Sequence, residues 1–351
     1  MALLLVKLRY LIEIIKTVEN WFSILLLLIG IRKNIVVVFR NGIRVEIPDK
    51  SRLDTIYPLI KIQLCSRILQ VPNGTYKIVL GDTEVVFQLT DEYSIYRAYM
   101  LSCLYKELNM KLYPEHNSCE FYFEGKKVVF FFDSKDDTWI HGLYDTFIID
   151  SYNVLKVRGK VVADIGASYG DTTLFFAFKG AKKVYAYEPI PWVAEMLEKN
   201  IKLNNLSSVV KVYPYAVSFC EGEAILTVPT KTSMMASLYY EDIFKSNKNV
   251  EVKYVRVQKV TMPPEAEVAK IDCEGCEYDI ILKWLKSRIY DEIIVEYHGD
   301  YGKLVKKLRE LGYKVEFLKF YIWGGGLLYA YTGDRKLDRL INRRVIKSKR
   351  F

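Results

Sequence analysis

The second half of the chain alternates short apolar strands with helices, and this alternation constrains the fold more than any other feature. "KVVADIG" (160–166) has the pattern of a buried strand, and "DTTLFFAFKG" (171–180) that of a helix that Asp171 caps and Gly180 ends. The strand "KKVYAYEP" and the helix "PWVAEMLEKNIKLNN", which begins at Pro191, repeat the unit. Strands that alternate with helices predict a parallel, doubly wound α/β sheet, which binds ligands beyond the carboxyl ends of its strands.

The alternation resumes later in the chain and then closes. "EVAKID" (267–272) and "DEIIVEYH" (291–298) are predicted strands on either side of the helix "YDIILKWLKS" (278–287), and "GKLVKKLRELG" (302–312) is a further helix. "YKVEFL" and "GGGLLYAY" then predict an antiparallel pair that completes the sheet.

The first half of the chain has a different pattern, with β-rich runs paired around turns. The predicted hairpin turns are Asn41-Gly42, Gly81-Asp82 and Glu124-Gly125. Between the last two, "DEYSIYRAYMLSCLYKEL" predicts a helix with Asp91 as its N-cap. We therefore divide the chain into an N-terminal α+β region of helices and hairpins (1–150), a doubly wound domain (151–334) and a basic tail (335–351).

The two ends of the chain each allow two interpretations. The tail carries eight Lys or Arg against one Asp, which fits either a solvated end or a contact with phosphates or anionic lipid. Residues 1–31 are very apolar, but charges interrupt them and the run 22–31 is too short to span a bilayer. We expect helices that pack on the protein itself. The alternative is an amphipathic helix lying on a membrane, with Lys16 and Asn20 on its polar face.

The cysteines indicate a compartment. Six are scattered without a framework pattern, which favours a reducing, cytoplasmic environment. If residues 1–31 contact a membrane, we expect the protein at the inner face of that membrane.

The first strand–loop–helix of the doubly wound half carries a glycine loop. In "ADIGASYGDT" (163–172), Gly166 and Gly170 allow a tight turn and the start of the next helix exposes N–H groups. The spacing is neither the G-x-G-x-x-G of dinucleotide sites nor a P-loop. Glu188 ends the second strand, where an acidic side chain can accept hydrogen bonds from ribose hydroxyls. Together these features favour S-adenosylmethionine over NAD or ATP.

These motifs, with "YAVS", "KIDCEGCEYDII" and "IIVEYH" further on, resemble the FkbM family of S-adenosylmethionine-dependent methyltransferases. The resemblance runs from about Val154 to Phe317. It implies the class I methyltransferase fold, a Rossmann-like doubly wound sheet of seven strands with an antiparallel last strand. It also implies that the cofactor is held by Asp164, Gly166, Ala167, Ser168, Gly170, Thr172, Glu188, Pro189, Ala216 and Asp272. Ser168 departs from the family, which commonly has Asn there, and we expect this to alter cofactor affinity without abolishing binding.

Four side chains at two neighbouring strand ends are candidate catalytic residues. Asp272 and Glu274 follow one strand, and Glu296 and His298 end the next. Methyl transfer to a hydroxyl benefits from a base, and His298 titrates nearest neutral pH, although it could merely hydrogen-bond its loop. Asp272 and Glu296 could instead hold a divalent cation, or the carboxylates could only orient the reactants. The sequence does not choose between these, and we assign no metal ligand.

Cys273 and Cys276 form a C-x-x-C pair within the same motif. The family usually has small apolar residues at these positions, so we expect both cysteines to be small buried residues. A zinc site lacks two further ligands, and the neighbouring carboxylates disfavour the thiolate that redox chemistry requires.

We therefore predict a methyltransferase that transfers a methyl group to a hydroxyl of a sugar, glycan, glycolipid or secondary metabolite. Ser237 and "TSMMASLYY" (232–240) lie where a substrate-facing loop is expected. One alternative is an RNA methyltransferase, which the basic tail motivates, although no RNA-binding module supports it and we expect no nucleic-acid partner. The other is a non-catalytic scaffold at a membrane that keeps the fold. The sequence leaves a homo-oligomer open.

Overall fold

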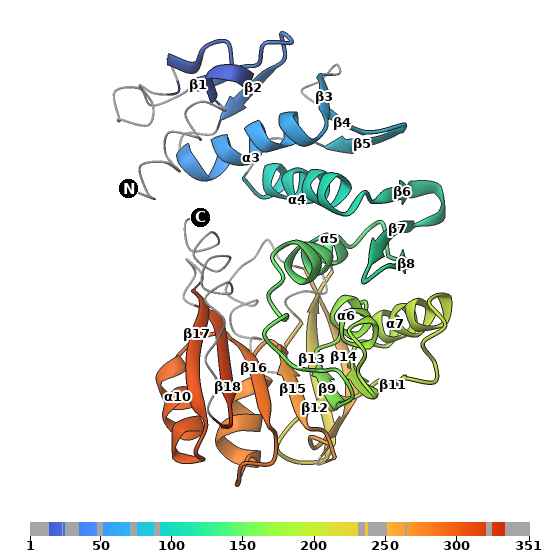
Figure 1. Ribbon diagram of the computed structural model, residues 1–351, viewed down its shortest axis with the longest axis vertical. Coiled ribbons are helices and arrows are strands. Elements are labelled where there is room, and N and C mark those ends of the chain that lie inside the picture. The colour runs from blue at the N-terminus through green and yellow to red at the C-terminus, as the bar shows by residue number, and fades with distance from the viewer. Residues whose placement is uncertain are drawn as a thin grey trace. The chain divides into compact units, whose positions relative to one another are not determined.

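The structure, a computed structural model, describes residues 14–22, 24, 35–47, 52–70, 76–87, 92–230, 236–237, 251–263, 265–320 and 325–333. The chain divides into two compact units, the first of residues 1–114 and 119–122 and the second of residues 115–118 and 123–351. This division falls earlier in the chain than residue 150, because the helices that follow the third hairpin belong to the second unit. Figure 1 labels the elements of both units.

The first unit is built from hairpins and two long helices (Figure 1). Its strands are β1 (Ile35–Val38), β2 (Arg44–Ile47), β3 (Arg67–Gln70), β4 (Tyr76–Leu80), β5 (Thr83–Phe87) and β6 (Lys111–Tyr113), and its helices are α3 (Arg52–Cys65) and α4 (Glu92–Leu108). The antiparallel pairs β1–β2 and β4–β5 confirm the first two predicted hairpins. Their turns contain Gly42 and Gly81, both with the positive φ that such turns require. Helix α4 confirms the predicted helix, whereas its predicted cap, Asp91, lies outside the described residues.

Part of the N-terminal segment packs on this unit. Ile14, Val18 and Ile24 are fully buried, and Asn20 hydrogen-bonds both Val36 O and Val38 N of β1, at 2.7 and 2.9 Å. None of the helices within the described ranges has the length and apolar character needed to cross a membrane. The rest of residues 1–31 and the tail 335–351, with the interpretations attached to them, lie outside the described residues.

The second unit contains a seven-stranded sheet in the order β11-β10-β9-β15-β16-β18-β17. The strands are β9 (Val161–Ile165), β10 (Lys183–Tyr187), β11 (Val210–Tyr213), β15 (Val268–Ile271), β16 (Glu292–Tyr297), β17 (Lys314–Phe320) and β18 (Gly326–Tyr331). The strands from β11 to β16 are parallel, and β18 is antiparallel to both of its neighbours. This confirms the predicted fold class.

Helices precede and connect the strands of this sheet. Before β9 come η2 (Pro114–His116), α5 (Thr138–Leu143) and η3 (Tyr144–Ile148), and between later strands come α6 (Asp171–Phe178), α7 (Pro191–Leu203), α9 (Cys276–Tyr278), η4 (Asp279–Trp284) and α10 (Tyr301–Glu310). Two predictions need correction. Gly170 (φ +97°), not Asp171, is the N-cap of α6, and the helix predicted over 278–287 begins at Cys276 and becomes a π-helix in η4.

Two further β structures lie outside the seven-stranded sheet. The hairpin β7 (Ser118–Phe123) and β8 (Lys126–Phe131) confirms the third predicted hairpin. A three-stranded sheet of β12 (Ala216–Val217), β13 (Gly222–Pro229) and β14 (Val252–Val260) was not predicted. It lies in the chain between β11 and β15.

Two asparagines, Asn200 in α7 and Asn204 at the C-cap of that helix, bind the outer edge of β8. Asn200 accepts from Phe131 N at 2.6 Å and donates to Phe131 O at 2.9 Å, and Asn204 makes the same pair of hydrogen bonds with Val129 at 2.9 and 2.6 Å. Four helical residues rise about 6 Å and two strand residues about 6.6 Å, so the two spacings match. Asn200 also donates to the carbonyl of Tyr169 at 2.8 Å, which ties the hairpin to the loop before α6.

Candidate active site

The glycine loop after β9 is held tightly against its neighbours. The amides of Gly166 and Ala167 donate to Tyr187 O at 3.0 and 2.9 Å, so the loop is tied to the end of β10. Gly166 has φ +74°, and a Cβ there would lie 1.7 Å from the carbonyl oxygen of Asp272. Only glycine fits where two strand-end loops meet this closely. Ser168 also has a positive φ, +48°, which is uncommon for a residue with a side chain.

Glu188 is buried at the end of β10, with 5% of its surface exposed. Its carboxylate accepts hydrogen bonds from Ser168 N at 3.0 Å and Ile190 N at 2.9 Å. Burial raises the pKa of Glu188 to about 7, against the opposing effect of these hydrogen bonds. Pro189 follows directly, and Ala216 is buried at the start of β12, just beyond β11.

Two other predicted cofactor residues bind each other beneath the loop. The Oδ2 atom of Asp164 accepts from Thr172 Oγ1 at 2.8 Å and from Thr173 Oγ1 at 2.6 Å, and all three side chains are buried. Its Oδ1 atom is buried and has no hydrogen-bond partner among the described residues. It lies 3.6 Å from Nζ of Lys270, a residue that the sequence analysis missed.

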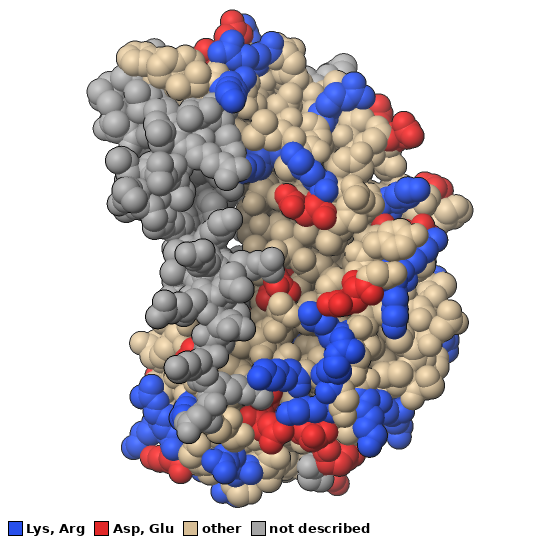
Figure 2. Space-filling model, viewed as in Figure 1, with Lys and Arg blue, Asp and Glu red and all other residues tan. Residues whose placement is uncertain are grey.

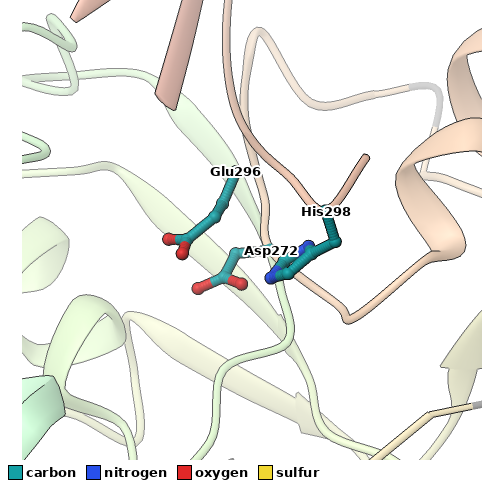
Figure 3. A group of neighbouring side chains, drawn as sticks. All are labelled: Asp272, Glu296 and His298. Carbon is teal, nitrogen blue, oxygen red and sulfur yellow. The ribbon is translucent and has the colours of Figure 1, made fainter. Parts of the chain in front are cut away.

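Three candidate side chains converge beyond β15 and β16. Asp272, Glu296 and His298 point toward one another in Figure 3, with potential ligand atoms within 4.8 Å of one another. Burial and then the carboxylate of Asp272 raise the pKa of Glu296 well above its usual range. Asp145, which pairs with Lys319 at 2.6 Å, adds to this rise. Glu296 therefore keeps its proton to a higher pH than an ordinary carboxyl group.

His298 lies between two carboxylates. Its Nε2 is 3.3 Å from Glu274 Oε2 and its Nδ1 is 3.1 Å from Glu277 Oε1. Burial alone would lower the pKa of His298, but the hydrogen bonds to these two glutamates raise it to about 11. The imidazole is therefore cationic at neutral pH and has no lone pair for a proton or a metal ion.

Glu277, an acidic residue of the same motif that was not among the candidate catalytic residues, organises the acidic loop after β15 (residues 272–275). It is fully buried and accepts from the amides of Gly275 and His298 at 2.8 and 3.2 Å. Ser237 joins this loop, because its Oγ donates to Glu274 O at 2.5 Å. The structure thus brings one residue of the expected substrate-facing segment to the site, while most of residues 232–240 lie outside the described ranges.

The C-x-x-C pair needs a correction. Cys273 and Cys276 are joined by a disulfide with a Cα–Cα distance of 5.5 Å, and are not two unlinked buried fillers. The bond encloses Glu274 (φ +52°) and Gly275 (φ +114°), both in left-handed conformations. It therefore closes the turn that carries the acidic loop, directly after Asp272.

The strand order of the sheet is that of a class I methyltransferase, and its candidate site lies at the carboxyl ends of β9, β10, β15 and β16. Residues 164–315, within the second unit, match the family model of the methyltransferase FkbM domain.

Two plant and animal proteins illustrate the curated relatives. Protein arginine N-methyltransferase 6 of Danio rerio is 30% identical over 146 residues, which cover 39% of this chain and 42% of that protein. Protein arginine N-methyltransferase 1 of Oryza sativa subsp. indica is 29% identical over 162 residues, which cover 42% and 41%. The chain thus spans about two-fifths of the length of these relatives.

Similar solved structures include two complexes. M. jannaschii TYW2 in complex with AdoMet is 16% identical and has a TM-score of 0.34, with 62% of this chain and 86% of that chain covered. P. horikoshii TYW2 in complex with MeSAdo is 17% identical and has a TM-score of 0.33, with 61% and 70% covered.

Proposed function

We propose that this protein is an S-adenosylmethionine-dependent methyltransferase that methylates a hydroxyl group on a sugar, glycan, glycolipid or secondary metabolite. One observation carries the proposal: a carboxylate suited to a nucleoside and one suited to the reacting end stand at the ends of β10 and β15, the two strands that flank β9, within a methyltransferase FkbM domain. A site of this kind places a ligand across the carboxyl ends of the strands.

The residues present fit the cofactor. Glu188 would accept hydrogen bonds from the ribose hydroxyls through lone pairs not used by its two backbone partners. The unpartnered Oδ1 of buried Asp164 leaves acceptor capacity under the glycine loop. Asp272, whose side chain is 27% exposed, provides negative charge at the reacting end. When bound, the cofactor supplies an electrophilic methyl group.

Among the four candidate catalytic residues, we assign the base to Glu296. His298 is already protonated, so it cannot accept the hydroxyl proton at neutral pH. Glu296 has a raised pKa and is therefore a stronger base, once ionised, than an ordinary carboxylate. In this assignment the acceptor O–H proton would pass to Glu296 as the oxygen bonds to the methyl carbon, whose bond to the sulfonium sulfur would break and leave S-adenosylhomocysteine. His298 holds Glu274, and Asp272 orients the reactants.

We infer no metal ion in this reaction. A divalent cation at Asp272, Glu296 and His298 would have to displace a glutamate from the imidazole, whose Nε2 and Nδ1 lie 3.3 and 3.1 Å from Glu274 and Glu277. Lys270 already lies 3.5 Å from Asp272 and compensates part of its charge. Turnover that is unchanged after chelation with EDTA is the expected result.

A second candidate is N-methylation of a guanidinium group. Two observations favour it: curated relatives are named protein arginine N-methyltransferases, and the site is rich in carboxylates that could face a cation. RNA is less favoured, because Lys and Arg alternate with Asp and Glu on the face in Figure 2 and form no uniformly basic surface there.

The first test is calorimetric titration with S-adenosylmethionine and S-adenosylhomocysteine. We expect wild type to bind both, and Glu188→Ala to weaken binding at least about tenfold because a charge-assisted hydrogen bond to the ribose is lost. Glu195→Ala, on an exposed position of α7, is the matched control and should bind as wild type does. A folded wild type that binds neither ligand would overturn the proposal.

With binding established, the acceptor class is decided by methyl incorporation. Tritiated methyl transfer to a glycan or glycolipid panel, and not to arginine-rich peptides, is the expected outcome. Transfer to the peptides alone would favour the second candidate.

A further inference from the structure

Lys270 is a buried charge in the centre of the sheet. It sits in β15 among Val268, Ala269 and Ile271, and only 2% of its surface is exposed. Burying an ammonium group costs several kcal/mol unless it is paired and hydrogen-bonded, and an apolar residue would fill this position at lower cost. Its presence where two strand-end loops meet therefore points to a role in the site.

The ammonium group contacts both loops. Its Nζ donates to the carbonyl oxygen of Ile165, the last residue of β9, at 3.3 Å. It also donates to the carbonyl oxygen of Gly166, the next residue in the glycine loop, at 2.7 Å. The same atom lies 3.6 Å from Asp164 Oδ1 and 3.5 Å from Asp272 Oδ2. One side chain thus connects the loop that would hold the cofactor to the carboxylate at the reacting end.

We propose that Lys270 is a positioning residue that fixes the glycine loop against Asp272 and limits the negative charge that the site presents to the sulfonium. This inference rests on the proposed function, since it concerns how the same site receives S-adenosylmethionine.

The second half of the proposal follows from the charges around the ammonium group. The acidic groups that act on it come from three elements and two loops: Asp164 in β9, Asp171 in α6, Glu296 in β16, Asp272 after β15, and Glu188 after β10. The positive charge of Lys270 offsets part of their combined field. Without it, the site would attract a cationic ligand more strongly than a neutral one of the same shape.

S-adenosylmethionine and S-adenosylhomocysteine provide this comparison, because they differ by one methyl group and one positive charge. We expect Lys270→Met to weaken binding of S-adenosylhomocysteine about tenfold, because the loop loses charge-assisted hydrogen bonds. Binding of S-adenosylmethionine, the cationic ligand, should weaken less. The ratio of the two dissociation constants should therefore change at least about threefold in favour of S-adenosylmethionine. A residue that served folding alone would change both constants by the same factor.

Two further variants complete the test. Lys270→Arg keeps the charge, so we expect both affinities to fall together and their ratio to stay at the wild-type value. Lys160→Met is the matched control: this ammonium also pairs with a carboxylate, Asp291 at 2.6 Å, but lies just before β9, at the opposite end of the strand. It should change neither affinity nor ratio. Thermal unfolding of each variant checks the fold, and Lys270→Gln replaces Lys270→Met if the latter does not fold.

The outcomes separate the two claims. Equal changes for both ligands in Lys270→Met, or no change at all, would refute the role of Lys270 while leaving the proposed function intact. Failure of wild type to bind either ligand would refute the proposed function itself.

Discussion

Among single residues, Glu296 should set the pH dependence of the reaction. As the proposed base it must be ionised, and its pKa lies above the usual range for a carboxyl group. Turnover should therefore rise with pH, and this acid limb of the pH profile should lie at higher pH than the pKa of an ordinary carboxyl group. Asp145→Asn removes one of the carboxylates that raise this pKa, and with it the ion pair to Lys319, whose charge lowers this pKa. We therefore expect the limb to move to lower pH.

Turnover measured against pH for both proteins checks this prediction. Lys283→Met is a suitable control, because this lysine pairs with Asp279 in η4 and takes no part in the proposed acid–base chemistry. An acid limb that stays in place in Asp145→Asn would argue against Glu296 as the base.

Glu188 should make cofactor binding depend on pH near neutrality. Its pKa is raised to about 7, chiefly by burial, and its ionised form is the better acceptor for ribose hydroxyls. Affinity for S-adenosylhomocysteine should therefore increase between about pH 6 and about pH 8. Calorimetry across this interval tests the prediction, and Glu188→Gln, which does not titrate, should bind weakly with a flat pH profile. A slope that persists in Glu188→Gln would assign the titration to another group.

At the scale of elements, the asparagines of α7 should be unequal in function although they make the same contacts with β8. Asn200→Ala and Asn204→Ala each leave partly buried backbone groups of β8 unpaired, so each should lower the free energy of unfolding by about 1 kcal/mol. Asn200 alone also holds Tyr169 O, in the glycine loop. Only Asn200→Ala should weaken cofactor binding.

Urea unfolding and calorimetry on this pair of variants separate the two effects, with Asn204→Ala as the matched control for Asn200→Ala. Equal cofactor affinities in the two variants would show that the link through Tyr169 has no consequence for the loop.

The disulfide after β15 should support turnover more than cofactor binding. Reduction by a dithiol such as dithiothreitol converts the bond to two thiols, and the turn with Glu274 and Gly275 in left-handed conformations loses its covalent closure. We expect lower turnover and nearly unchanged affinity for S-adenosylhomocysteine, because Glu188 is on another strand. The Cys273→Ser/Cys276→Ser variant should behave as the reduced protein does, and Cys220→Ser as the oxidised wild type. Full activity of the double variant would contradict the prediction.

Across the whole molecule, the elements that are determined by short stretches of sequence could be predicted. The contacts between segments far apart in the chain could not. Three hairpins followed from their turn residues, and the parallel strands from apolar runs that alternate with helices. The closing antiparallel pair β17–β18 was also read from the sequence. The sheet β12-β14-β13 was missed, although β14 alternates polar and apolar residues, because no strong turn signal joins it to β13. The π-helices have the same apolar spacing as α-helices over a single turn, so their pattern did not reveal them.

The candidate site divides in the same way. Acidic residues at strand ends were expected in the site from motif positions alone. Lys270 was passed over as an ordinary member of its strand, and Glu277 was given no role in the site, because their contacts join segments far apart in the chain. Ser168 is instructive: the family's Asn at this position suits a left-handed backbone, and the structure has that conformation at Ser168 (φ +48°).

The asparagines on α7 also bear on how copies of the molecule can meet. The last strand of a sheet offers a row of donors and acceptors on which a strand from another chain can add, which is the first step of edge-to-edge aggregation. On β8 these groups at Val129 and Phe131 are occupied by carboxamides that imitate a neighbouring peptide group. A helix here takes the place of the missing strand, and it protects the hairpin from polymerisation because a helix cannot extend the sheet any further.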